Sequence, residues 1–189
     1  MKILCFNAGP KKQGATTEIL RIVQERIRGH EVEMICLGEK EIHYCQGCKT
    51  CYSTRNCVQK DDMESVLAKI EECDVLVIAA PSWWADIPGQ FKVFIDRCTP
   101  YGVTDPASQS FYFRPGKKCY AVALRAGTRP VECEHIIECI AHWCGHMGIE
   151  MVDSLYFCGI NGPKDIEPHR ERIGEKATEW FGKEMSLRS

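Results

Sequence analysis

The sequence lacks three features that would each define a class of protein. Its 189 residues carry 24 Lys and Arg against 26 Asp and Glu, so there is no basic surface for nucleic acid or for an anionic membrane. The longest apolar run, Val75 to Ala85, is too short to cross a bilayer. Without a repeat, low-complexity tract or linker, residues 1–189 are expected to form a single domain.

The common nucleotide fingerprints and a secretory leader are also missing. Neither a Walker A sequence nor G-x-G-x-x-G is present, which argues against ATP and against a Rossmann dinucleotide. Met1 to Asn7 is a short apolar run that Lys11 and Lys12 follow, whereas a signal peptide carries its positive charge first. We therefore expect a cytoplasmic protein.

Cysteine, in contrast, is abundant. The chain has 13 cysteines, an odd number that cannot pair completely within one chain. In a reducing compartment they are expected to be free thiols, some of them metal ligands. Isolated cysteines are predicted to be small core residues; these are Cys36, Cys73, Cys98 and Cys119.

Apolar runs alternate with amphipathic stretches along the whole chain. Strands are predicted at Lys2–Asn7, Glu31–Leu37, Val75–Ala80, Lys118–Leu124 and Glu150–Phe157. Helices are predicted from Thr16 as N-cap, from Asp61 with Glu64 as a capping box, from Pro88, over Val131–Met147 and over Pro168–Met185. The pattern predicts a flavodoxin-like three-layer α/β sandwich with a parallel sheet of order 2-1-3-4-5. That order places a ligand crevice beyond the carboxyl ends of the first and third strands.

The turn after the first predicted strand has the composition of an anion site. It runs from Gly9 to Thr17 into a helix N-terminus, where unpaired N–H groups and the helix dipole favour a phosphate. Thr16 and Thr17 add hydroxyl groups, Lys11 adds charge, and Gly14 permits a close approach of the backbone. A capped turn with solvated lysines is the alternative.

This turn resembles the "GSPRKxGNT" loop of the NADPH-dependent FMN reductase family and of its relatives, the iron–sulfur flavoproteins. The segment 9–12 stands in place of Ser-Pro-Arg-Lys, and the segment 14–16 in place of Gly-Asn-Thr. The resemblance implies that the turn holds the phosphate of FMN. Lys11 replaces an arginine and cannot form its bidentate fork.

A tryptophan-containing loop follows the third predicted strand. Pro81, Ser82, Trp83 and Trp84 begin it, and both indole rings cannot belong to the core. They suit a flat isoalloxazine ring, although a dimer interface is an alternative. The stretch 81–97 resembles the family's "PxYWxxxxGQLKxFIDR" motif.

The turn after the fourth predicted strand matches the family less closely. Ala126 and Gly127 stand where the family has a small, glycine-containing flavin loop. We assign both residues to FMN binding on this resemblance.

A long loop is predicted at residues 38–60, and it contains Cys45, Cys48, Cys51 and Cys57 in the spacing C-x2-C-x2-C-x5-C. Thiolates this close in sequence can wrap one cubic cluster. The spacing resembles that of the iron–sulfur flavoproteins, where this loop holds a 4Fe-4S cluster beside the FMN. Tetrahedral zinc, free thiols and redox disulfides remain alternatives.

The resemblance implies an FMN-dependent oxidoreductase that passes electrons between FMN and a 4Fe-4S cluster, with NAD(P)H or ferredoxin as donor. No side chain is assigned as a catalytic acid or base, because the cofactors carry the chemistry. The alternatives are an NAD(P)H-dependent FMN or quinone reductase without a cluster, and a non-catalytic flavodoxin-like electron carrier.

Two further features of the sequence bear on assembly and metal binding. Phe111, Tyr112 and Phe113 are expected to be exposed, which favours a homodimer or homotetramer. Cys139, His142 and His146 fall on one side of a predicted helix, and we interpret this side as a polar face rather than a metal site.

Overall fold

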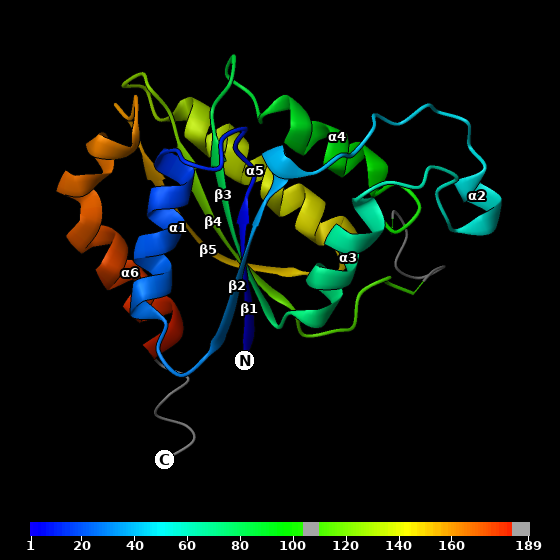
Figure 1. Ribbon diagram of the computed structural model, residues 1–189, viewed down its shortest axis with the longest axis horizontal. Helices are drawn as coiled ribbons and strands as arrows, with labels where there is room; N and C mark the ends of the chain where they lie inside the picture. The colour runs from blue at the N-terminus through cyan, green and yellow to red at the C-terminus, as the bar shows by residue number, and fades with distance from the viewer. Residues whose placement is uncertain (104–109, 183–189) are drawn as a thin grey trace.

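The structure is a computed structural model, described for residues 1–103 and 110–182, and its centre is one parallel sheet (Figure 1). The strand order is β2-β1-β3-β4-β5, and every neighbouring pair is parallel. The strands are β1 (Lys2–Asn7), β2 (Glu31–Cys36), β3 (Val75–Pro81), β4 (Lys118–Leu124) and β5 (Glu150–Phe157). The predicted fold and strand order are confirmed.

Helices cover both faces of the sheet, α1 and α6 on one face and α3, α4 and α5 on the other (Figure 1). Their bounds are α1 (Ala15–Arg26), α2 (Cys51–Thr54), α3 (Met63–Glu72), α4 (Gly89–Arg97), α5 (Val131–Met147) and α6 (Arg170–Gly182). Short 3₁₀ turns occupy Leu37–Glu39 and Pro163–His169. Across residues 1–103 and 110–182, no helix is long and apolar enough to span a bilayer.

The central strand shows why the sheet needs helices on both faces. Leu76 and Ile78 pack into the core beneath α3, α4 and α5, whereas Val75 and Val77 pack into the core beneath α1 and α6. Successive side chains of a strand point to opposite faces of the sheet. A strand that is apolar at every position must therefore be covered by helices on both faces.

Two predicted helix starts are wrong. The N-cap of α1 is Gly14, not Thr16, and Gly14 is extended with no side-chain cap. The first turn therefore begins before the threonines. Helix α3 begins at Met63 with Asp62 as its N-cap and no capping box, and the Asp61 carboxylate accepts from Arg97 and from the Met63 N–H.

The burial of several predicted residues needs correction. Cys73, Cys98 and Cys119 are buried as predicted, and Cys36 is half-buried. Phe113 is buried in the core rather than exposed, and Lys117 Nζ lies 5.9 Å from its ring centroid. Phe111 and Tyr112 are exposed as expected.

The last predicted helix differs from the structure at its start. The predicted end of the last helix, at Met185, lies outside the described residues. That helix begins at Arg170, because a 3₁₀ turn contains Pro168.

A buried ion pair fastens the cysteine-containing segment to the body of the protein. Arg97 ends α4, and its Nη1 and Nη2 lie 2.6 and 3.1 Å from the two carboxylate oxygens of Asp61. Both side chains are 1% exposed. Arg97 also donates to the carbonyl of His43 at 2.8 Å, and Asp61 accepts from the backbone N–H groups of His43 and Met63. The pair thus joins both ends of the segment 43–61 to α4.

The hydrogen bonds keep the Asp61 carboxylate ionised. Burial by itself would raise its pKa, but the hydrogen bonds from Arg97, His43 and Met63 outweigh burial and lower the pKa from 3.8 to about 2. Because the folded-state pKa is below the ordinary value, the pair stabilises the fold above about pH 4. That stabilisation is lost as the pH falls through about 2.

Asp61→Asn should lower the free energy of unfolding at pH 7 by about 3–5 kcal/mol, since it leaves the Arg97 guanidinium buried without its anion. Denaturant unfolding measures the difference, which should shrink as the pH falls from about 4 to about 2. Glu64→Gln is the control. It removes an exposed carboxylate paired with Lys60 and should cost less than about 1 kcal/mol. Equal losses in the two variants would contradict the role assigned to the buried pair.

Candidate functional site

A cavity of ≈260 Å³ lies beyond the carboxyl ends of the sheet strands. Its walls come from the segments 10–16 after β1, 81–83 after β3, 124–126 after β4 and 160–163 after β5. This is the edge at which the strand order 2-1-3-4-5 places a ligand crevice.

The N-terminus of α1 opens into this cavity. Glu18 N–H makes the first intrahelical bond, to Gly14 O at 3.0 Å, so the N–H groups of residues 15–17 have no partner within the helix. Gly14 supplies no side-chain cap, and Ala15 and Thr16 line the cavity. An anion placed here would accept these hydrogen bonds and would be favoured by the helix dipole.

The two threonines of this turn have different environments. Thr17 Oγ1 donates to Lys12 O at 2.7 Å and accepts from Asn7 Nδ2 at 2.9 Å, so it shapes the turn from within. In the described part of the chain, the Thr16 hydroxyl has no hydrogen-bond partner, and it lines the cavity. Thr16 is therefore the threonine available to a ligand.

Positive charge lies on two sides of the cavity. Lys11 lines it, while Lys12 turns away into an ion pair with Glu39 at 2.8 Å. Arg125 lines the opposite wall and pairs with Glu132 at 2.8 Å. The Arg125 Nε is buried without a partner among the described residues.

The tryptophans lie on a tight turn after β3. Trp83 and Asp86 exchange two backbone hydrogen bonds of 2.9 and 3.1 Å, and Trp84 and Ala85 between them have φ of 52° and 61°. This is the backbone of a two-residue hairpin turn with positive φ at both central positions. Trp84 is fully exposed and Trp83 is 49% exposed, so neither belongs to the core.

The predicted binding residues divide into three groups. Those that line the cavity are Lys11, Gly14, Thr16, Pro81, Ser82, Trp83 and Ala126. Trp84 and Gly127 line a neighbouring open hollow of ≈560 Å³ instead. Gly9 and Thr17 line neither cavity. Asn7 accepts a hydrogen bond from Gly9 N–H and donates one to Thr17 Oγ1.

Sequence reasoning missed Arg125 and the segment 160–163. The prediction assigns only Ala126 and Gly127 from the turn after β4 and no residue from the turn after β5, although both turns lie at the carboxyl edge of the sheet, where ligands bind.

The four cysteines of the long loop line one small cavity of ≈30 Å³ against the end of α4. Cys45 and Cys48 are exposed, and Cys51 and Cys57 are half-buried. Cys51 also begins α2, a short helix in the segment predicted to be irregular, and Figure 1 shows α2 standing out from the sheet.

The thiols affect one another electrostatically. Burial raises the pKa of Cys51, and the neighbouring Cys48, Cys57 and Cys45 thiolates raise it further. Hydrogen bonds from Thr50 lower the pKa of Cys48. In a zinc tetrahedron the sulfur atoms lie about 3.8 Å apart. In the described part of the chain, no three of these sulfur atoms lie within 4.8 Å of one another, which is wider than a single zinc ion requires.

A larger hollow of ≈650 Å³ lies between α4 and α5, lined by Ile95, Trp143 and their neighbours. None of its lining residues belongs to the turn 9–17, so we place the anion-binding site in the smaller cavity.

Comparison with known proteins gives a consistent set of matches. The family model for NADPH-dependent FMN reductase matches residues 1–135. An "Iron-sulfur flavoprotein" from Archaeoglobus fulgidus is 36% identical over 104 residues, which cover 54% of this chain and 47% of that protein. An "Iron-sulfur flavoprotein" from Methanosarcina thermophila is 27% identical over 163 residues, 85% of this chain and 82% of that protein.

A solved structure supports the fold. The FMN-dependent NADH-azoreductase from Bacillus anthracis, in complex with FMN, superposes with a TM-score of 0.69 at 15% identity, covering 96% of this chain and 100% of that one. The chain spans about half the length of the Archaeoglobus relatives that it matches. Because the family model covers residues 1–135, well over half of the sequence, the chain belongs to the NADPH-dependent FMN reductase family.

Proposed function

We propose that the protein is an FMN-dependent oxidoreductase that passes electrons between FMN, bound in the cavity at the strand ends, and a 4Fe-4S cluster on the long loop. The observation that carries the proposal is that Cys45, Cys48, Cys51 and Cys57 line one cavity. The relatives named as iron–sulfur flavoproteins support it.

The residues at the strand ends fit FMN. The free N–H groups at the start of α1, the Thr16 hydroxyl and the Lys11 ammonium would hold the phosphate. Trp83 and the segments 124–126 and 160–163 would enclose the isoalloxazine ring. Bound FMN supplies a carrier that takes electrons in pairs and releases them singly, while this chain binds and orients it.

The arrangement of the four cysteines supports a multi-iron cluster over a single zinc ion. Its four thiols are free, and their spacing is wider than one zinc ion needs. Arg97 lies beside Cys57 and places a positive charge at the wall of the cavity. Cys45 and Cys48 are exposed, so iron and sulfide can reach the site from solvent.

The donor we propose first is NAD(P)H. The open hollow of ≈560 Å³ adjoins the proposed FMN cavity and shares Ser82, Trp83 and Arg125 with it. A nicotinamide ring could approach the FMN through this hollow. The same arrangement would serve a cluster-free FMN or quinone reductase, which is our second candidate. Ferredoxin is the alternative donor, and a homodimer or homotetramer in the cytoplasm remains our prediction.

Thr16→Val should weaken FMN binding by about 10- to 150-fold, because a lost hydrogen bond to a charged group costs roughly 1.5–3 kcal/mol. Thr16→Ser restores the hydroxyl and should bind FMN like wild type. Riboflavin, which lacks the phosphate, should bind both variants equally. Fluorescence titration of the apoprotein measures all three. An equal loss of FMN and riboflavin in Thr16→Val would move the phosphate away from Thr16.

Anaerobic reconstitution should give about four irons and four sulfides per chain, and Cys51→Ala should lose them while keeping FMN. Cys158→Ala, which removes a half-buried cysteine outside the loop, is the control and should keep its cluster. Iron and sulfide analysis with visible spectra gives the result. An iron-free wild type would leave the cluster-free reductase as the better account, and full iron in Cys51→Ala would remove Cys51 from the proposed ligands.

A further inference from the structure

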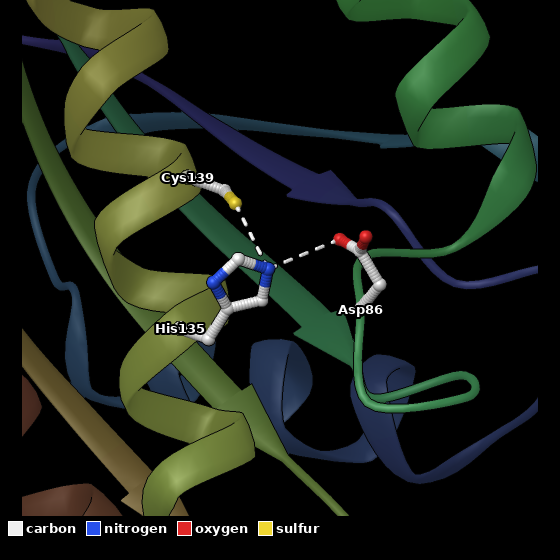
Figure 2. A group of neighbouring side chains, drawn as sticks. All are labelled: Asp86, His135 and Cys139. Carbon is white, nitrogen blue, oxygen red and sulfur yellow. Dashed lines mark hydrogen bonds and ion pairs between the residues drawn. The ribbon is translucent and has the colours of Figure 1, made fainter.

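A group of metal-ligating side chains lies on α5, apart from the two sites already described. His135 and Cys139 are four residues apart and therefore share one face of the helix, and Asp86 reaches them from the turn after β3. Figure 2 shows the three side chains pointing toward one another. The His135 Nε2 lies 3.6 Å from Cys139 Sγ and 3.4 Å from Asp86 Oδ1.

These contacts do not have the geometry of a catalytic triad. In a triad the nucleophile and the carboxylate engage opposite nitrogens of the imidazole ring. Here both contacts end on the same nitrogen, as Figure 2 shows. The N···O distance of 3.4 Å is also longer than the roughly 2.7–3.2 Å of an N–H···O hydrogen bond.

The same separations match the edges of a zinc coordination tetrahedron. Zinc binds imidazole nitrogen at about 2.0–2.1 Å, thiolate sulfur at about 2.3 Å and carboxylate oxygen at about 2.0–2.2 Å. At tetrahedral angles these bonds place nitrogen about 3.5–3.6 Å from sulfur and about 3.3–3.5 Å from oxygen. The observed distances are 3.6 and 3.4 Å, and all three ligand atoms lie within 4.8 Å of one another.

We propose that Asp86, His135 and Cys139 bind a zinc ion, with the fourth coordination position open to water. His135 and Cys139 line the hollow of ≈650 Å³ between α4 and α5, so an ion can enter from solvent. The backbone N–H of Ile87 donates to Asp86 Oδ1 at 2.7 Å and so orients the carboxylate.

The site differs from the one considered on sequence spacing. Cys139 lies with His135 and Asp86, not with His142 and His146. Those two histidines contact each other, Nε2 to Nε2 at 3.1 Å, and His146 Nδ1 contacts Val103 O at 2.9 Å.

Zinc at this position would fasten the tryptophan turn to α5. Asp86 closes that turn through its two backbone hydrogen bonds with Trp83, and Trp83 lines the cavity at the strand ends. An ion on Asp86 therefore restrains the wall of that cavity. The effect on FMN rests on the proposed function, whereas the metal site does not.

Cobalt(II) replaces zinc as a spectroscopic probe. We would use the full chain with Cys45, Cys48, Cys51 and Cys57 all changed to Ser, which removes the competing thiols. We expect one Co²⁺ per chain, with tetrahedral d–d bands and a thiolate-to-metal charge-transfer band, all abolished by added Zn²⁺. Cys139→Ser should remove the charge-transfer band, and His135→Ala should weaken binding by more than about 10-fold.

His142→Ala is the matched control, because it removes a histidine from the same helix and the same hollow. It should bind Co²⁺ like its parent. Absence of a charge-transfer band, or an equal loss in His142→Ala, would overturn the proposed ligand set.

If the four-serine chain does not fold, zinc is counted by native mass spectrometry after reconstitution of the otherwise unaltered chain. Cys139→Ser should then hold one zinc fewer, and an equal count would overturn the proposal. FMN titration of each variant shows separately whether flavin binding fails.

Discussion

The ion pair between Arg97 and Asp61 is the constraint on which the cysteine-containing segment depends. Residues 43–50 are all exposed, so this part of the chain has almost no apolar packing of its own. Its position is set where it leaves and rejoins the body, by the bonds from Arg97 to His43 and to Asp61. Separating the pair would leave a buried charge without its partner, which costs free energy. The two ends of the segment therefore stay together.

The same arginine connects the scaffold to the cysteine cavity. Arg97 lines the cavity of the four cysteines and lies beside Cys57, so one guanidinium both closes the segment and places positive charge beside the cysteines. At the strand ends, hydrogen bonds within the turn after β1 hold the backbone in place. Asn7 and Thr17 hold the turn from below, which leaves the start of α1 and Thr16 free to face a ligand. At the strand ends, separate residues thus hold the turn and face the cavity, whereas at the cysteine cavity Arg97 does both.

The elements and the strand order were predictable from sequence, and the long-range contacts between side chains were not. The bounds of β1, β4, β5 and α5 agree with the prediction, because apolar runs and helical periodicity are local signals. The sequence D-x-x-E predicted a capping box at Asp61, but its partner Arg97 lies 36 residues away and leaves no sequence signal. The proximity of Asp86 to α5 is hidden for the same reason. Thr16 and Thr17 have the same chemistry, and only the structure separates their roles.

The iron content of Arg97→Lys after anaerobic reconstitution tests most directly whether the ion pair organises the cysteine site. Lysine keeps the positive charge but lacks the planar fork that bonds to Asp61 and His43 together. The four cysteines should then no longer be held at one cavity. We expect the variant to bind FMN like wild type and to retain clearly less iron per chain. An iron content equal to that of wild type, with the same rate of loss to a chelator, would contradict the central role of this pair.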